Sequence, residues 1–183
     1  MIEKMNDVRL LRADEIECRV GQVKKDGSGC SLLLYKDARV DMRVLDETVG
    51  PGNWMRSHRL VGNNLYCRVS IWSNELGMWV AKEDVGVESK TEKEKGEASD
   101  AFKRACFNWG IGRELYTAPF VWVNYTDEEK RGAFVKFAVR EIEYDSKRNI
   151  SYLLITDNKG NARYEYGKRG KQGIINFDKE VVV

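Results

Sequence analysis

The chain has 183 residues, of which 42% are hydrophobic and 33% are charged. This composition can bury the core of one domain, or of one domain with an appendage, and no apolar run approaches the roughly 20 residues of a membrane span. The 31 basic and 29 acidic residues leave a formal net charge of +2, so any site for a polyanion must be local. The first residues lack the apolar segment of a secretory signal, and we expect a cytoplasmic protein.

Cysteine and histidine usage predicts no disulfide framework and no zinc site. The four cysteines contain no C-x-x-C pair, and His58 is the single histidine. No serine or cysteine motif supplies a nucleophile that could pair with His58, so we expect His58 on the surface of a loop. The sequence therefore predicts reduced thiols, no metal and no cofactor.

The N-terminal part predicts a hairpin. Residues 16–23 and 30–35 suit short strands, and the turn-like segment Lys24-Lys25-Asp26-Gly27-Ser28-Gly29 separates them.

A short helix is expected next, capped by Asp37 and ending at Gly50-Pro51-Gly52. Arg39 and Arg43 are four residues apart and share one face of this helix, which makes a cationic ridge. For Arg43, an ion pair with the acidic residues at 46 and 47 is the better alternative.

A second hairpin follows the Gly-Pro-Gly turn. Apolar and polar residues alternate over 65–72, which is typical of a half-buried strand, and Asn74 to Gly77 turns the chain into a partner strand over 78–85. Trp54 lies just after the preceding turn, where it could stack on a base or cover a helix end.

The most informative stretch is a long helix over residues 89–110. Ser89 and Glu92 fit a capping box, and the glycine at position 110 favours a stop. Apolar residues recur at three- and four-residue spacing: Ala98, Ala101, Phe102, Ala105, Cys106 and Trp109. At about 100° per residue they form one buried stripe, with Lys103 and Arg104 on its two flanks. The helix thus offers two cations from a rigid platform.

The C-terminal third predicts a β-meander with strands at 133–144, 150–156 and 162–166. A glycine-rich basic segment follows, with Lys168 and Arg169. We expect an α+β protein with a core domain over 1–123 and the meander and basic tail over 124–183, packed on the same domain.

Several motifs occur in unbroken order between residues 32 and 119. They are Tyr35-x-Asp37-Ala38-Arg39, Leu45-Asp46-Glu47, Val49-Gly50-Pro51-Gly52-Asn53-Trp54, the hairpin that ends in Glu83-Asp84-Val85-Gly86, and Ala98-Ser99-Asp100-Ala101-Phe102-Lys103-Arg104-Ala105. In this combination the chain resembles the Rad fifty-two type single-strand annealing proteins, particularly their bacterial and phage branch. Agreement over several motifs is more specific than a lone basic pair.

The resemblance implies a β-β-β-α core, in which an antiparallel sheet packs on a long helix. It implies assembly into a ring or helical oligomer, with single-stranded DNA in a basic groove and no nucleotide hydrolysis. Lys103 and Arg104 match the family's basic pair that faces the DNA backbone, and Arg39 matches its groove arginine. Eukaryotic members carry a further basic residue where this chain has Phe107, so the resemblance does not extend to a second, outer DNA site. The candidate DNA-binding residues are Arg39, Arg43, Trp54, Lys103, Arg104, Arg113, Lys168 and Arg169.

Annealing requires that one strand be held by its phosphates while its base edges stay open, and lysine and arginine suit this task. The sequence therefore predicts ATP-independent binding and annealing of single-stranded DNA in recombination or DNA repair, by a homo-oligomer that is not an enzyme. A host or phage single-strand binding protein is a candidate further partner. One alternative is a passive coating protein; another is a metal-dependent nuclease that gathers Glu83, Asp84 and Asp100 around magnesium.

Overall fold

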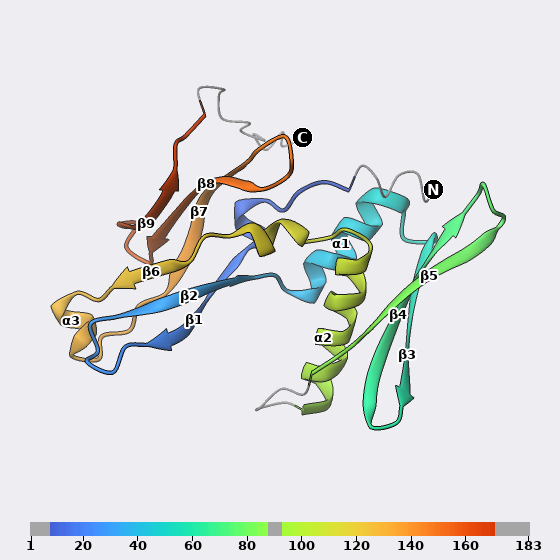
Figure 1. Ribbon diagram of the computed structural model, residues 1–183, viewed down its shortest axis with the longest axis horizontal. Helices are drawn as coiled ribbons and strands as arrows, with labels where there is room; N and C mark the ends of the chain where they lie inside the picture. Colours follow the sequence, from blue (N-terminus) through green and yellow to red (C-terminus); the bar gives the residue numbers. More distant parts are fainter. Residues whose placement is uncertain (1–7, 88–92, 171–183) are drawn as a thin grey trace, which may run out of the picture.

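The computed structural model describes residues 8–87 and 93–170 of the chain (Figure 1). It is an α+β protein in which two helices, α1 and α2, lie between a larger and a smaller antiparallel sheet. The predicted capping box at Ser89 and Glu92 lies outside the described residues. Within those residues, no helix has the length and apolar character needed to cross a membrane.

The larger sheet has six strands in the order β6-β2-β1-β7-β8-β9. The strands are β1 (Glu17–Val23), β2 (Gly29–Tyr35), β6 (Val121–Asn124), β7 (Phe137–Tyr144), β8 (Ile150–Asp157) and β9 (Ala162–Gly167). The N-terminal hairpin and the C-terminal meander are present as the sequence predicts, but the meander is not separate from the hairpin. Strand β7 lies beside β1, with Ala138 opposite Glu17.

The two edge strands of this sheet approach each other, so that the sheet is close to a barrel (Figure 1). Arg163 of β9 donates to the carbonyl oxygen of Asn124 in β6 at 2.8 Å, and the Tyr164 hydroxyl donates to that of Phe120 at 3.1 Å. The Arg163 guanidinium also pairs at 2.7 Å with Glu129 of the short helix α3 (Asp127–Lys130). Sequence analysis predicts neither β6 nor α3, because four-residue elements carry too few positions for a periodic pattern.

The smaller sheet has three strands, β3 (Trp54–Val61), β4 (Asn64–Ser73) and β5 (Met78–Val85). The sequence predicts only β4 and β5. Strand β3 pairs with β4 over its full length, from Trp54 opposite Ile71 to Val61 opposite Asn64. Residues 55–61 are all exposed, so no alternation of burial marks them as a strand. His58, expected in a loop, lies on the surface of this strand.

Helix α1 (Ala38–Val49) begins at the predicted cap, where the Asp37 carboxylate accepts a hydrogen bond from the Arg39 backbone at 2.8 Å. It ends at Gly50, whose φ of 87° favours glycine.

Helix α2 (Lys93–Asn108) follows β5 and packs on β4, β5 and α1, so the chain has the β-β-β-α order that the resemblance implies. The predicted apolar stripe is the buried face of α2, since Ala101, Phe102, Ala105 and Cys106 are fully buried. Gly86 is the point of closest approach between sheet and helix, because a Cβ there would lie 2.2 Å from the carbonyl oxygen of Glu97. The platform under Lys103 and Arg104 is therefore a tightly packed unit.

Candidate nucleic-acid interface

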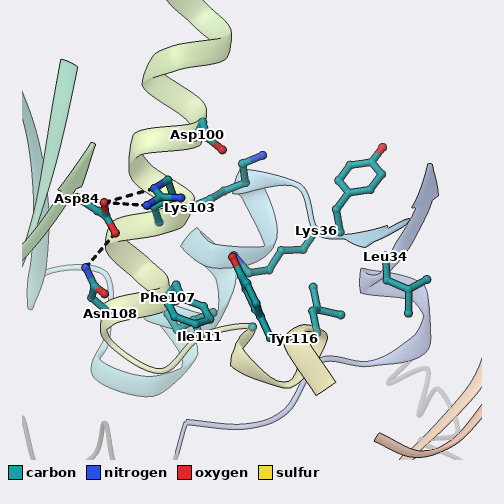
Figure 2. Close-up of a pocket in the computed structure, with 13 residues that line it drawn as sticks. Leu34, Lys36, Asp84, Asp100, Lys103, Phe107, Asn108, Ile111 and Tyr116 are labelled. Carbon is teal, nitrogen blue, oxygen red and sulfur yellow. Dashed lines mark hydrogen bonds and ion pairs between the residues drawn. The ribbon is translucent and has the colours of Figure 1, made fainter. Parts of the chain in front are cut away.

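A groove of about 400 Å³ lies beside the C-terminal half of α2 (Figure 2). Its walls are α2, the end of β2 and the short 3-10 helix η3 (Arg113–Thr117). The lining residues are Leu34, Tyr35, Lys36, Asp84, Asp100, Lys103, Arg104, Phe107, Asn108, Ile111, Gly112, Leu115 and Tyr116. We call this hollow the groove. It contains the basic pair that the sequence singles out.

The two cations of α2 differ in their surroundings. Arg104 is exposed and lies 3.3 Å from the Asp84 carboxylate of β5, which fixes the direction of its guanidinium. Lys103 is half-buried and forms no ion pair within the described part of the chain. Its charge contributes to the lowered pKa of Asp37, although the main cause is the hydrogen bond from the Arg39 side chain. Lys103 thus leaves a positive charge available in the groove.

Lys36, one of the lining residues of the groove, belongs to an ion pair that the sequence does not predict. The Lys36 ammonium contacts the Asp41 carboxylate, and both side chains are buried. Burial raises the pKa of Asp41 to about 6, against the opposing charges of Lys36 and Lys103. The second carboxylate oxygen, Oδ2, is buried without a hydrogen-bond partner. The ionised Asp41 carboxylate is thus a buried negative charge that interacts with the charges of Lys36 and Lys103.

Gly112, which also lines the groove, is favoured at its position for two reasons. Its φ of 76° is the left-handed conformation that favours glycine, and a Cβ would lie 2.2 Å from Cε of Lys36. The Gly112 position therefore gives Lys36 its space as well as turning the chain after α2.

Aromatic rings form one side of the groove. Phe107 and Tyr116 lie 4.7 Å apart between ring centroids, tilted by 56°, and Tyr116 is 78% exposed. The Arg113 guanidinium lies 5.5 Å from the Phe107 ring. An exposed ring beside cations is the arrangement on which nucleic-acid bases stack.

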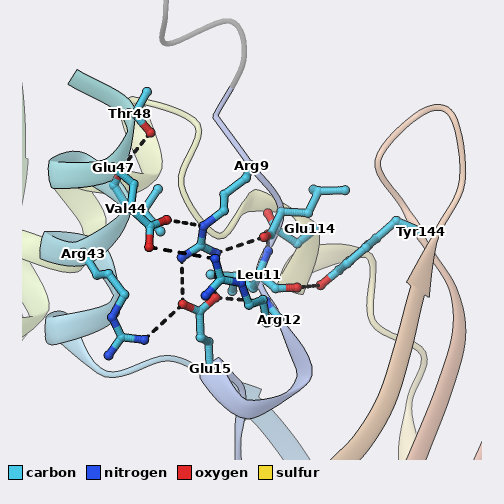
Figure 3. Close-up of polar contacts among 11 residues, drawn as sticks. Arg9, Leu11, Arg12, Glu15, Arg43, Val44, Glu47, Thr48, Glu114 and Tyr144 are labelled. Atoms are coloured by element: carbon cyan, nitrogen blue, oxygen red, sulfur yellow. Dashed lines mark hydrogen bonds and ion pairs between the residues drawn. The ribbon is translucent and has the colours of Figure 1, made fainter. Parts of the chain in front are cut away.

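The structure places the two candidate arginines of α1 on different sides. Arg39 lies at the start of the helix, just after the groove residues Tyr35 and Lys36, and its exposed guanidinium contacts Asp37 at 2.8 Å. Arg43 points instead toward the N-terminal segment, where it lies 3.3 Å from Glu15 (Figure 3). The expected pairing of Arg43 with an acid on its own helix is wrong, because Arg9 occupies Glu47 and the buried Glu15 carboxylate faces Arg43.

Two further candidates have structural contacts. The indole of Trp54 donates to Asp46 at 2.7 Å and stacks on Phe102 with ring centroids 6.1 Å apart, so it covers the core between α1 and α2. The Arg113 guanidinium donates to the carbonyl oxygens of residues 107 and 108, each at 2.8 Å, and so caps the C-terminal end of α2.

The last two candidates lie just beyond β9. Lys168 is exposed, and Arg169 pairs with Glu141 of β7 at 2.9 Å. Neither residue lines the groove. Of the candidates, the structure therefore brings only Lys103 and Arg104 together as lining residues of the groove.

The carboxylates of the nuclease alternative do not converge. Glu83 pairs with arginines of β3 and β4, Asp84 pairs with Arg104, and Asp100 accepts a hydrogen bond from the backbone of Val87. Within residues 8–87 and 93–170, no group of three or more histidine, cysteine or acidic side chains is arranged to hold a metal ion.

Fold and groove together define an α+β protein in which a groove along one helix is lined by basic, acidic and aromatic side chains. No model of a known protein family matches the chain. Two curated relatives are similar to it, both named single-stranded DNA-binding protein DdrA. The relative from Deinococcus deserti is 33% identical over 120 residues, which covers 64% of this chain and 58% of the relative. The relative from Deinococcus radiodurans is 36% identical over 103 residues, which covers 55% of this chain and 48% of the relative. The matches thus span about half the length of these distant homologues.

Proposed function

We propose that the chain binds single-stranded DNA in the groove and promotes the annealing of complementary strands without nucleotide hydrolysis. The observation that carries this proposal is the groove itself, which places Lys103 and Arg104 on one rigid helix opposite the exposed ring of Tyr116. The names of the two DdrA relatives support the same ligand.

The chemistry of the groove suits a strand held by its backbone. Lysine and arginine bind phosphates without reading sequence, and the two cations project from a helix whose opposite face is fully buried. Tyr116 can stack on one base at a time, which leaves neighbouring base edges open for pairing. The groove therefore contains side chains that can hold a DNA strand by its phosphates and bases. Among its described residues, no nucleophile lies beside a base that could activate it.

Oligomerisation is part of this proposal. A few phosphate contacts per subunit give weak, salt-sensitive binding, and repetition along one strand multiplies them. Strands β3 and β5 are the edges of the three-stranded sheet, and within the described residues neither edge pairs with a further strand. Unpaired edges are templates for strand pairing between chains. We infer that neighbouring subunits join through these edges.

The experiment is fluorescence-detected pairing of two complementary oligonucleotides, without nucleotide and across salt concentrations. We expect acceleration that is restricted to complementary strands and is lost at high salt. Tight binding that blocks pairing would instead indicate a coating protein. Cleavage of the oligonucleotides that depends on magnesium would support the nuclease alternative.

The groove is tested with the Lys103→Ala/Arg104→Ala variant. We expect binding to weaken by at least about tenfold at moderate salt, because two phosphate contacts are removed. Lys24→Ala/Lys25→Ala removes the same charge from the exposed β1–β2 turn and is the matched control. Unchanged binding by a variant with a native circular-dichroism spectrum would mean that the groove is not the DNA site.

A further inference from the structure

A second hollow, of about 460 Å³, lies at the C-terminal end of α2, on the other side of Asn108 from the groove. It is bounded by β5, by η3 and by the turn between β7 and β8. Four cations line it, one or two from each of these elements: Lys82, Arg113, Lys147 and Arg148. We call it the second hollow. These elements are distant in the sequence, and only the fold brings their charges together.

None of these four cations forms an ion pair with a carboxylate within the described residues. Lys82 donates to the carbonyl oxygen of Asn108 at 2.8 Å and lies 4.6 Å from the centroid of the Trp109 ring. Arg113 donates to two carbonyl oxygens of the same helix end. Arg148 donates to the carbonyl oxygen of Val8. Neutral partners fix these side chains without cancelling their charges.

The negative groups nearby do not balance the four cations. Glu114 lines the second hollow but is buried, and its carboxylate accepts a hydrogen bond from the backbone of Leu11 at 2.8 Å. Asp145 accepts hydrogen bonds from the backbone of its own turn, at residues 147 and 149. The end of a helix carries about half a negative charge. Burial and the charge of Arg113 together lower the pKa of Lys82, as expected where cations crowd.

We propose that the second hollow binds a phosphate of the DNA backbone, so that a strand held in the groove continues over the end of α2 and is held again by Lys82 and Lys147. This inference rests on the proposed function for the identity of the strand. Phosphate oxygens accept hydrogen bonds from several cations at once, and such charge-assisted bonds are stronger than neutral ones. Asn108 lines both the groove and the second hollow, so the two are adjacent.

The test is fluorescence anisotropy of a labelled oligothymidylate, titrated at several salt concentrations with the Lys82→Gln/Lys147→Gln variant. We expect binding about tenfold weaker than that of the wild type, and a slope of log affinity against log salt reduced by about 0.7 for each phosphate that the variant no longer neutralises. Lys25→Gln/Lys159→Gln is the matched control, since both lysines are exposed in other turns and the variant loses the same charge. Lys147→Gln alone is the second variant, because this exposed side chain has no structural bond to lose within the described residues.

The outcomes separate this inference from the proposed function. If the second-hollow variants bind like the wild type while Lys103→Ala/Arg104→Ala binds weakly, the second hollow is not a DNA site. If the second-hollow variants bind weakly while the groove variant is unchanged, the second hollow holds DNA and the assignment of the groove is wrong. A decrease in affinity equal to that of the Lys25→Gln/Lys159→Gln control would reflect overall charge and overturn the proposal. Inorganic phosphate that stabilises the wild type but not the variants against heat, with no change in oligothymidylate binding, would show a free-phosphate site and overturn it as well.

Discussion

At the scale of single residues, a buried carboxylate contacts a lysine of the groove, and its charge opposes the proposed binding of DNA. Asp41 is fully buried, one of its oxygens has no hydrogen-bond partner, and its charge interacts with those of Lys36 and Lys103. A buried carboxylate is tolerated when a cation pairs with it, and Lys36 supplies that cation. Asp41 thus holds Lys36 in place at the cost of an ionised group in the core.

This arrangement predicts a pH dependence of stability. The pKa of Asp41 is raised in the folded chain from its ordinary value of 3.8 to about 6, so between these values the folded state binds more protons than the unfolded state. Wild-type stability should therefore rise, relative to Asp41→Asn, by about 1 kcal/mol for each pH unit as the pH falls from 6 to 4. Urea unfolding of both proteins across this range measures the difference. A difference independent of pH would show that Asp41 is not the titrating group.

At the scale of elements, the approach of β5 to α2 decides whether the platform under the basic pair forms. Gly86 is buried at this contact, and an added Cβ would meet the backbone of the helix at Glu97 and Ala101. Backbone atoms cannot rotate away as a flexible side chain can.

Gly86→Ala should therefore lower the free energy of unfolding by about 2 kcal/mol. Gly52→Ala is the control, because a Cβ at position 52 would have open space and the φ angle of Gly52 is not positive. Chemical denaturation measures both variants. Equal stability of the two variants would mean that β5 and α2 do not pack as closely as described.

Closure of the larger sheet depends on one arginine. Arg163 contacts Glu129 of α3 at 2.7 Å, Asp157 of β8 at 3.3 Å and the Phe137 ring at 5.4 Å, and its side chain is only 9% exposed. The guanidinium lowers the pKa of Glu129. Protonation of this carboxyl in acid therefore removes the stabilising pair.

Arg163→Ala should lower the free energy of unfolding by about 2 kcal/mol at neutral pH, with a smaller decrease below the pKa of Glu129. Arg140→Ala is the matched control, an exposed arginine on β7. Thermal and urea unfolding at pH 7 and pH 3 test this prediction. Similar effects of the two substitutions would contradict a stabilising role for the Arg163 contacts.

At the scale of the whole molecule, the proposed oligomer makes a prediction about the exposed edge of β3. Val61 and Asn64 close the β3–β4 hairpin as opposite residues, so the neighbouring pair Leu60 and Leu65 is not hydrogen-bonded. Consistent with this, the carbonyl oxygen of Leu65 bonds to Gly86 instead. The backbone N–H of Leu60 therefore points away from β4, toward solvent or a neighbouring chain.

Leu60→Pro should remove an intermolecular hydrogen bond without removing one inside the sheet, and the oligomer should dissociate into smaller species. Leu60→Ala keeps the backbone donor and is the control. Sedimentation velocity measures the assembly, and circular dichroism establishes that each variant is folded. Unchanged mass of the Leu60→Pro variant would exclude this edge as the interface.

Local signals determined the parts of this protein that could be predicted from sequence. The Asp37 cap, the apolar stripe that includes Phe102 and the hairpin around Gly77 each depend on residues close in the chain, and each is present. Lys103 and Arg104 were identifiable because a helical period fixes their place relative to that stripe. The division of the chain at residue 123 stays a prediction.

Tertiary structure alone decided which distant residues meet. Lys36 carried no signal in the sequence, because its pairing with Asp41 and the space left by Gly112 exist only when α1, α2 and η3 are packed. Strand β3 is not predicted because its exposed residues show no period. Trp54 is half-buried and covers the core because Phe102 lies against it. Local sequence sets the direction of a side chain along its own element, whereas burial and charge at a site depend on the elements packed around it.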